Sequence, residues 1–147
     1  CRFVLIGEND DNNPNSIHTS QLLKWQNEGI IEWWGHQKNM PAVMKKIDIV
    51  CLPSYREGLP KALLEAASSG LPIVTTDVPG CREVVEHSIN GFLVPPKDSS
   101  VLIKPLKQLI DSKNLRLSMG KLGREKVMNN LSSDIIDLNH LDLYISL

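Results

Sequence analysis

The stretch DIVCLPSYREGLPKALLEAASSGLPIVTT, residues 48–76, contains two apolar runs separated by a loop and a helical pattern. The runs DIVCL and LPIVTT are typical of short strands buried in a parallel sheet. Between them, PKALLEAASSG predicts a helix with Pro60 in its first turn and Gly70 at its end. Parallel strands require such a crossover, so the stretch predicts a βαβ unit. The residues expected to face the sheet are Ala62, Leu63, Ala66 and Ala67.

The same alternation continues along the rest of the chain. Strands are expected in FVLIG (3–7), IIEWWG (30–35) and NGFLVPP (90–96), the first of them buried on both faces. Helices are expected over residues 17–28 with Ser16 as N-cap, over 39–47 and 80–87, and in three segments from Asp98 onward. The pattern predicts an α/β fold, a Rossmann-like parallel sheet flanked by helices. Ligands of such folds bind beyond the carboxyl ends of the strands, here the loops after Ile6, Trp34, Leu52, Val74 and Val94.

Composition narrows the classes of partner. The 147 residues suit one domain, and 16 basic against 17 acidic residues give a net charge of −1, which does not favour nucleic acid. Three widely spaced cysteines indicate reduced thiols in a cytoplasmic protein. No apolar run approaches the roughly 18 residues of a membrane span. The histidines are scattered, so no metal site is expected.

Two carboxylates stand near the start of the helix in the opening stretch. Glu57 lies in the loop just before the helix, and Glu65 lies within it. A helix N-terminus offers N–H donors to a phosphate, Gly58 lets a ligand approach the backbone, and carboxylates accept hydrogen bonds from sugar hydroxyls. Together these features suit a nucleotide sugar. The spacing leaves a second interpretation equally open, in which Glu57 complements the helix dipole and Glu65 is merely solvent-exposed.

Several other residues have two interpretations each. Arg56 and Lys61 flank the proposed phosphate position, so they are donor-binding candidates as well as ordinary solvated cations. His36 is either a contact to a nucleobase or a polar surface group. The tryptophans are candidates for base stacking or, for at least two of them, for core packing; they are Trp25, Trp33 and Trp34.

A family resemblance covers nearly the whole chain. The segment LPSYREGLPKALLEAASSGLPIVTTDVPGCREVVEHSINGFLVPPKD, residues 52–98, resembles the signature region of the retaining GT-B glycosyltransferases of family 4, the glycosyl transferases group 1, in their C-terminal donor-binding domain. Glu57 and Glu65 match the family's E-x7-E motif. VPGCREVVEHSINGFLVPP matches its G-G-x-x-E-like turn and following strand, with Pro79 in place of the first glycine and Glu83 as the acid. Glu83 is expected to brace its loop.

The resemblance implies a role for each matching residue. Glu57, the catalytic candidate, would bind hydroxyls of the transferred sugar, and Glu65 would bind the ribose hydroxyls. The backbone of Gly58, Leu59 and Pro60 would line the sugar and diphosphate site. The nucleobase would dock at the turn formed by Trp34, Gly35 and His36, and Gly7 would face the same cleft. The donor would be a nucleotide-diphosphate sugar, with UDP as the expected nucleotide, and neither a metal nor another cofactor is expected.

The resemblance also implies a domain organisation. Residues 1–130 would form a partial C-terminal donor-binding domain, and residues 131–147 a helical segment that packs toward an N-terminal domain. That domain would hold the acceptor, a saccharide or lipid-linked saccharide of polysaccharide, lipopolysaccharide or capsule biosynthesis. The chain opens on Cys1 and enters a strand at once, so it reads as part of a longer hexosyltransferase and is expected to be inactive alone. The whole protein would be cytoplasmic and peripherally associated with the inner face of the membrane. Two alternatives stay open: a non-catalytic nucleotide-sugar-binding module and a hydrolysing sugar-nucleotide epimerase.

Overall fold

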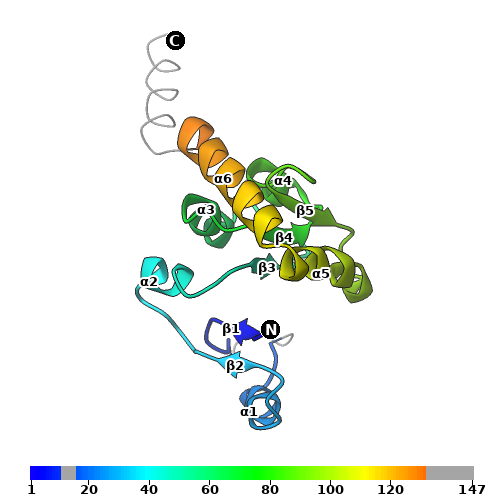
Figure 1. Cartoon of the computed structure of the whole chain (residues 1–147). Coiled ribbons are helices and arrows are strands. Elements are labelled where there is room, and N and C mark those ends of the chain that lie inside the picture. The colour runs from blue at the N-terminus through cyan, green and yellow to red at the C-terminus, as the bar shows by residue number, and fades with distance from the viewer. Residues whose placement is uncertain (11–15, 132–147) are drawn as a thin grey trace. The chain divides into compact units, whose positions relative to one another are not determined.

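The computed structural model describes residues 1–10 and 16–131 (Figure 1). The chain divides into two compact units, Cys1–Val43 and Met44–Leu147. The segment expected over residues 131–147 lies outside the described residues, apart from Leu131. The domain boundary at residue 130 therefore stays a prediction. In the described part of the chain, no helix is both long and apolar enough to cross a membrane.

The first unit contains a two-stranded parallel sheet joined by one helix. Its elements are β1 (Val4–Leu5), α1 (Thr19–Asn27) and β2 (Glu32–Trp33), followed by α2 (Met40–Met44) at the border between the units. Val4 pairs with Glu32 and Leu5 with Trp33. Gly29 follows α1 with φ of +71°, the left-handed conformation expected of a helix-ending glycine.

Two predictions for this unit were wrong. Ser16 does not cap α1, which begins at Thr19 with His18 as N-cap; the Ser16 hydroxyl instead donates to the Asn9 side chain. The first strand is not buried on both faces, because Phe3 is 55% and Leu5 is 39% exposed. In the described residues β1 pairs with β2 alone, and a strand in so small a sheet gains little cover.

The second unit is a three-stranded parallel sheet flanked by helices. Its elements in chain order are β3 (Val50–Leu52), α3 (Lys61–Ser68), β4 (Ile73–Thr76), α4 (Pro79–Val84), β5 (Gly91–Val94), the 3₁₀ turn η1 (Ser99–Leu102), α5 (Ile103–Asp111) and α6 (Lys113–Asn130). The strand order is β3-β4-β5 with β4 in the centre. Ile73 pairs with Val50 on one side and with Gly91 on the other. The predicted α/β fold with a parallel sheet is confirmed.

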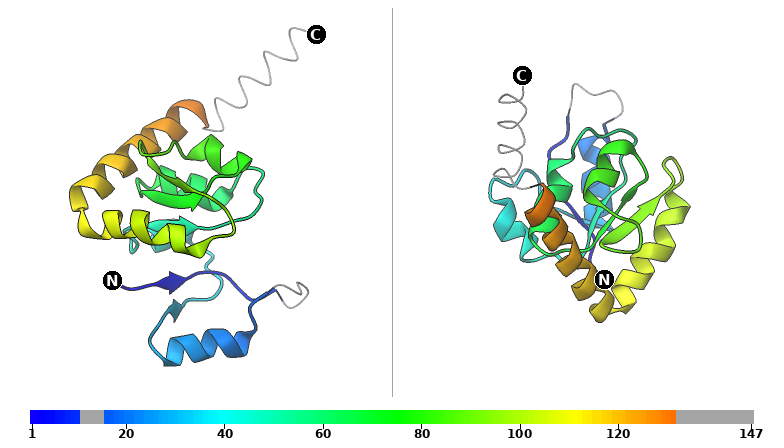
Figure 2. Two further views of the ribbon diagram at one scale, coloured as in Figure 1. Left: turned by 90° about the vertical axis from the view of Figure 1, so that its right-hand side faces the viewer. Right: turned by 90° about the horizontal axis from the view of Figure 1, so that it is seen from above.

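The hydrophobic core of this unit forms around β4, all four residues of which are buried. Val74 clusters with Phe92, Leu109 and Met119, which come from β5, α5 and α6. Helices α5 and α6 contact each other and meet like the arms of a V (Figure 2). Burying these large apolar side chains is the main source of stability for the unit.

Two details of packing differ from the sequence-based expectation. On α3, the residues Leu63, Ala66 and Ala67 are fully buried as predicted, but Ala62 is exposed because it lies in the first turn, at the edge of the buried stripe. β3 was expected to be a buried strand, yet Cys51 is exposed. β3 lies at an edge of the described sheet, whereas β4 has neighbours on both sides.

Helix α6 crosses the end of α3 at backbone contact. A Cβ atom added to Gly120 would lie 1.9 Å from the carbonyl oxygen of Gly70, which itself has φ of +73°. One turn later the fit is ordinary, since a Cβ at Gly123 would meet Asn90 and Ala67 at 3.7 to 3.8 Å. The crossing therefore requires glycine at position 120 but not at position 123.

The same substitution should destabilise the protein at position 120 but not at position 123. Gly120→Ala should lower the free energy of unfolding by about 2 kcal/mol, because the backbone has to move apart to admit the methyl group. Gly123→Ala should leave it unchanged or raise it by up to about 1 kcal/mol, since alanine is the better helix former. Urea denaturation of the purified variants measures both. Equal effects at the two positions would contradict the crossing described here.

Candidate functional site

The loop after β3 carries Glu57, and the chain itself holds one oxygen of its carboxylate. The hydroxyl of Ser54 donates a hydrogen bond to Glu57 Oε1 at 2.6 Å. Both residues are half-buried, and the amide of Ser54 donates to the carbonyl of Leu52 at 3.0 Å. The loop follows the carboxyl end of a parallel strand, the edge at which α/β folds bind ligands. Glu57 is therefore an oriented acceptor at a position suited to a ligand.

Two threonines of β4 hold this loop from the neighbouring strand. Thr75 Oγ1 donates to the carbonyl of Leu52 at 2.7 Å, and Thr76 Oγ1 donates to the carbonyl of Ser54. Successive side chains of a strand point to opposite faces, so the two hydroxyls reach the loop from both faces of the sheet. These contacts were not predicted from the sequence. The available signal was the pair of hydroxyls in a fully buried strand, where each needs a hydrogen-bond partner.

The start of α4 contacts the backbone of the same loop. A Cβ atom added to Gly80 would lie 1.9 Å from the Gly58 carbonyl oxygen and 2.6 Å from the Glu57 carbonyl oxygen. The two backbones are thus in direct contact, and any side chain at position 80 would displace the loop. Gly80 stands at the second glycine of the G-G-x-x-E-like turn, but its contact with the carbonyls of Glu57 and Gly58 was not predicted from the sequence.

The start of α3 adjoins the loop at Pro60. Pro60 is buried and has extended backbone (φ −72°, ψ 110°). It is the N-cap of α3 and not a residue of its first turn as predicted, so the helix begins at Lys61. The first N–H groups of a helix have no acceptor within the helix, so this end suits an anion. Gly58 and Leu59 are exposed, and a Cβ at Gly58 would meet nothing within 4 Å. The loop backbone is accessible here, although contact with a ligand stays a prediction.

Glu65 lies in the second turn of α3 with its side chain only 30% exposed. It forms an ion pair with Lys61 at 3.7 Å, whose side chain is 87% exposed. A pair so open to solvent contributes less than about 1 kcal/mol to stability. The Glu65 carboxylate is therefore partly shielded from solvent, and its ion pair with Lys61 is weak. Arg56 is exposed in the loop, and the roles of Arg56 and Lys61 stay predictions.

An ion pair and an asparagine fix the segments that follow β4. Arg82 Nε donates to Asp77 Oδ1 at 2.5 Å, and this hydrogen bond holds the pKa of the exposed Asp77 carboxyl below its usual value. Glu83, expected to brace the loop at the start of its helix, is exposed, and its bracing role stays a prediction. The buried Asn90 braces the segment after α4: its Oδ1 accepts from the amide of Glu86 at 2.6 Å and its Nδ2 donates to the carbonyl of Val84 at 2.9 Å.

The remaining candidates lie in the first unit, where three of them come together. Gly7, with φ of +132°, donates from its amide to the carbonyl of Gly35 at 2.9 Å, and Gly35 has φ of +61°. The half-buried Trp34 lies beside them after β2, whereas His36 is exposed. Trp33 is half-buried, and its indole N–H donates to the carbonyl of Gly7 at 2.9 Å. Base binding by the turn stays a prediction.

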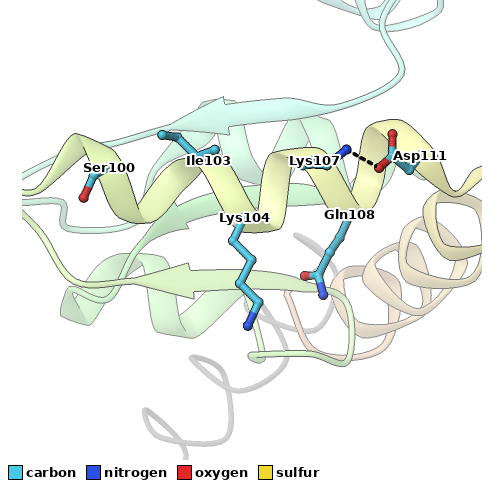
Figure 3. Close-up of a pocket in the computed structure, with 6 residues that line it drawn as sticks. All are labelled: Ser100, Ile103, Lys104, Lys107, Gln108 and Asp111. Carbon is cyan, nitrogen blue, oxygen red and sulfur yellow. Dashed lines mark hydrogen bonds and ion pairs between the residues drawn. The ribbon is translucent and has the colours of Figure 1, made fainter.

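One hollow of the described surface lies away from these residues. It has a volume of about 530 Å³ and lies along η1 and α5. Figure 3 shows Lys104 and Gln108 on one side of the helix and Lys107 paired with Asp111. A hollow lined by the solvent-facing side of a single helix encloses little of a ligand. Within residues 1–10 and 16–131, no three His, Cys, Asp or Glu side chains gather as a metal site.

Comparison with known proteins places the chain in a family. The family model described as glycosyl transferases group 1 matches residues 1–112. The chain belongs to this family. Its recognition from the E-x7-E segment is thus confirmed at the level of group 1.

Two curated bacterial relatives and one solved structure illustrate the similarity. The chain is 30% identical, over 98% of its length and 37% of the relative's, to N,N'-diacetylbacillosaminyl-diphospho-undecaprenol alpha-1,3-N-acetylgalactosaminyltransferase of Campylobacter jejuni. It is 29% identical, over 88% of its length and 33% of the relative's, to UDP-Gal:alpha-D-GlcNAc-diphosphoundecaprenol alpha-1,3-galactosyltransferase of Escherichia coli. The C-terminal domain of LpcC, a glycosyl transferase group 1 family protein of Francisella tularensis, superposes with a TM-score of 0.77 at 25% identity, over 90% of this chain and 70% of that one.

The chain covers only part of the length of these relatives. The chain spans 37% and 33% of the lengths of the two relatives, and it matches a solved domain over most of both chains. The likeness to LpcC agrees with the predicted GT-B fold class.

The contact at Gly80 leads to a prediction about the loop with Glu57. Gly80→Ala should lower the free energy of unfolding by about 2 kcal/mol, because its methyl group overlaps the Gly58 carbonyl. Gly58→Ala is the matched control and should change it by less than about 1 kcal/mol, since the added methyl enters open space. Urea denaturation measures both. A stable Gly80→Ala variant that is cleaved by trypsin after Arg56 no faster than the wild type would contradict the contact.

Proposed function

We propose that this chain is the donor-binding part of a retaining, metal-independent glycosyltransferase of family 4. The enzyme transfers a hexose-type sugar from a nucleotide-diphosphate sugar, with UDP as the nucleotide, to a glycan or lipid-linked saccharide. In the reaction the bond between the anomeric carbon and the diphosphate breaks, a bond to an acceptor hydroxyl oxygen forms, and the acceptor's proton is released. The acceptor site lies in the part of the protein beyond this chain.

The observation that carries the proposal is the arrangement around the start of α3. An oriented carboxylate, Glu57, precedes an accessible backbone at Gly58 and a helix N-terminus, and the half-buried Glu65 follows in the second turn. The helix end suits the diphosphate, Glu57 the hydroxyls of the transferred sugar, and Glu65 the ribose hydroxyls. Arg56 and Lys61 supply nearby positive charge.

The names of the relatives support the substrate classes. One relative is named for UDP-Gal as donor, and both are named for acceptors on diphospho-undecaprenol. Both names also specify alpha linkages, which a retaining transfer forms from an alpha-linked donor. Acceptors with polyprenol chains lie in a membrane, which supports a cytoplasmic protein that works peripherally at the inner membrane face. A relative in Staphylococcus aureus, 29% identical over 92% of this chain, is named for capsular polysaccharide biosynthesis, which supports a role in polysaccharide, lipopolysaccharide or capsule biosynthesis.

Substitution of the two glutamates separates their proposed roles. In the full-length protein, Glu57→Gln should lower kcat/KM for transfer by about 10- to 100-fold, the size expected when a charged hydrogen-bond acceptor is lost. It should leave the affinity for UDP unchanged, because UDP lacks the transferred sugar that Glu57 is proposed to bind. Glu65→Gln should weaken UDP itself by about tenfold. Calorimetry with UDP and UDP-sugars, together with a radiolabelled transfer assay, measures these effects.

The same measurements distinguish the two other functions considered. A panel of UDP-, GDP- and ADP-sugars that stabilises the protein without any transfer would identify a non-catalytic binding module. Release of UDP with an altered free sugar and no acceptor present would identify a hydrolysing epimerase. No stabilisation of the full-length protein by any nucleotide-diphosphate sugar would overturn the proposal, and unchanged turnover in the presence of EDTA is expected of a metal-independent enzyme.

A further inference from the structure

We propose that Ser54 is a positioning residue for Glu57, and that Thr76 holds Ser54 in place. The inference rests on the proposed role of Glu57 in binding the transferred sugar. It concerns the side chains that aim this carboxylate, and three contacts of the described loop support it.

The first contact is the hydrogen bond from the Ser54 hydroxyl to Glu57 Oε1. Its length of 2.6 Å is typical of a hydroxyl that donates to a charged carboxylate, the stronger class of hydrogen bond. A glutamate side chain has three rotatable bonds, so an untethered Glu57 would sample many positions. The bond selects one of them and leaves the second carboxylate oxygen as the acceptor for a ligand hydroxyl.

The second contact fixes the serine itself. Thr76 is 3% exposed, and its hydroxyl donates to the carbonyl of Ser54. On the other face of the sheet Thr75 donates to the carbonyl of Leu52, at the end of β3. The backbone is therefore held at Leu52, two residues before Ser54, and at Ser54 itself. The buried, central strand β4 supplies both donors, so the position of Ser54 is tied to the core of the unit.

The third contact limits the loop on the side of Glu57. The backbone of Gly80 lies against the carbonyls of Glu57 and Gly58, so the loop cannot shift toward α4 without a clash. The backbone is thus restrained at several points, while the Glu57 carboxylate itself is held by the Ser54 hydroxyl. A serine hydroxyl has a single proton to donate. While it donates to Glu57 it cannot also donate to a ligand, which assigns it a positioning role instead of a direct one.

A double-mutant cycle in the full-length protein tests this inference. Ser54→Ala should lower kcat/KM for transfer by about tenfold, the size expected for the loss of one hydrogen bond to a charged group. Ser54→Thr retains a hydroxyl and should restore most of the loss. In a Glu57→Gln background, Ser54→Ala should have little further effect, because residues that act through one another are not additive. UDP affinity should be unchanged by Ser54→Ala.

The contribution of Thr76 is tested in the same assay. Thr76→Val keeps the shape of the side chain but leaves the Ser54 carbonyl without its donor, so kcat/KM should fall in the same direction as in Ser54→Ala. Thermal denaturation of every variant separates this effect from unfolding, and activity is compared at a temperature where each variant is folded. Ser118→Ala, on the exposed face of α6, is the matched serine control and should leave kcat/KM unchanged.

The outcomes separate this inference from the function on which it rests. If Glu57→Gln has no effect on transfer, the proposed role of Glu57 fails. If Glu57→Gln impairs transfer but Ser54→Ala does not, the positioning role alone fails. It also fails if the effects of Ser54→Ala and Glu57→Gln multiply in the double variant, since Ser54 would then act independently, or if Ser54→Ala weakens UDP as much as it impairs transfer.

Discussion

The hydrogen bonds from the Thr75 and Thr76 hydroxyls to the end of β3 and to the loop that follows it connect the core of this protein to its candidate site. Both threonines belong to the fully buried central strand, and each hydroxyl finds an acceptor in a neighbouring backbone carbonyl. Buried hydroxyls without partners would destabilise the sheet. The two hydrogen bonds that give the buried threonine hydroxyls their partners therefore also determine where the loop with Glu57 lies. Stability of the sheet and geometry of the site depend on one set of bonds.

Sequence patterns were sufficient for the main elements of the second unit. Strand β4 and the buried face of α3 followed from short apolar runs and from the spacing of Leu63, Ala66 and Ala67, because burial imposes those periods directly. Predictions that depended on the surroundings of an element were less successful. Cys51 was expected in a buried strand but lies exposed at a sheet edge, and the sequence of one strand does not reveal its neighbours.

The candidate site shows the same division. Glu57 and Glu65 were found from their spacing and from a family motif, and the structure places them before and within α3 as expected. The contacts of Ser54, Thr76 and Gly80 were not found, because each joins segments that are brought together only by the fold. Asn90 is similar: its side chain binds the backbone of Val84 and Glu86 across the segment after α4, a contact that was not predicted from the sequence. Short-range signals thus identify candidate binding residues more readily than the residues that hold them in place.

The two glycine contacts have a consequence for recombination between members of this family. At Gly80 and Gly120 the partner is a carbonyl oxygen of another segment, so the fit depends on the path of that segment and not on its side chains. A chimera that takes α4 from one relative and the loop after β3 from another combines two halves of one backbone surface. The same holds for α6 and the turn at Gly70. Crossover points that keep each pair of segments together preserve these surfaces, whatever the overall identity of the two parents.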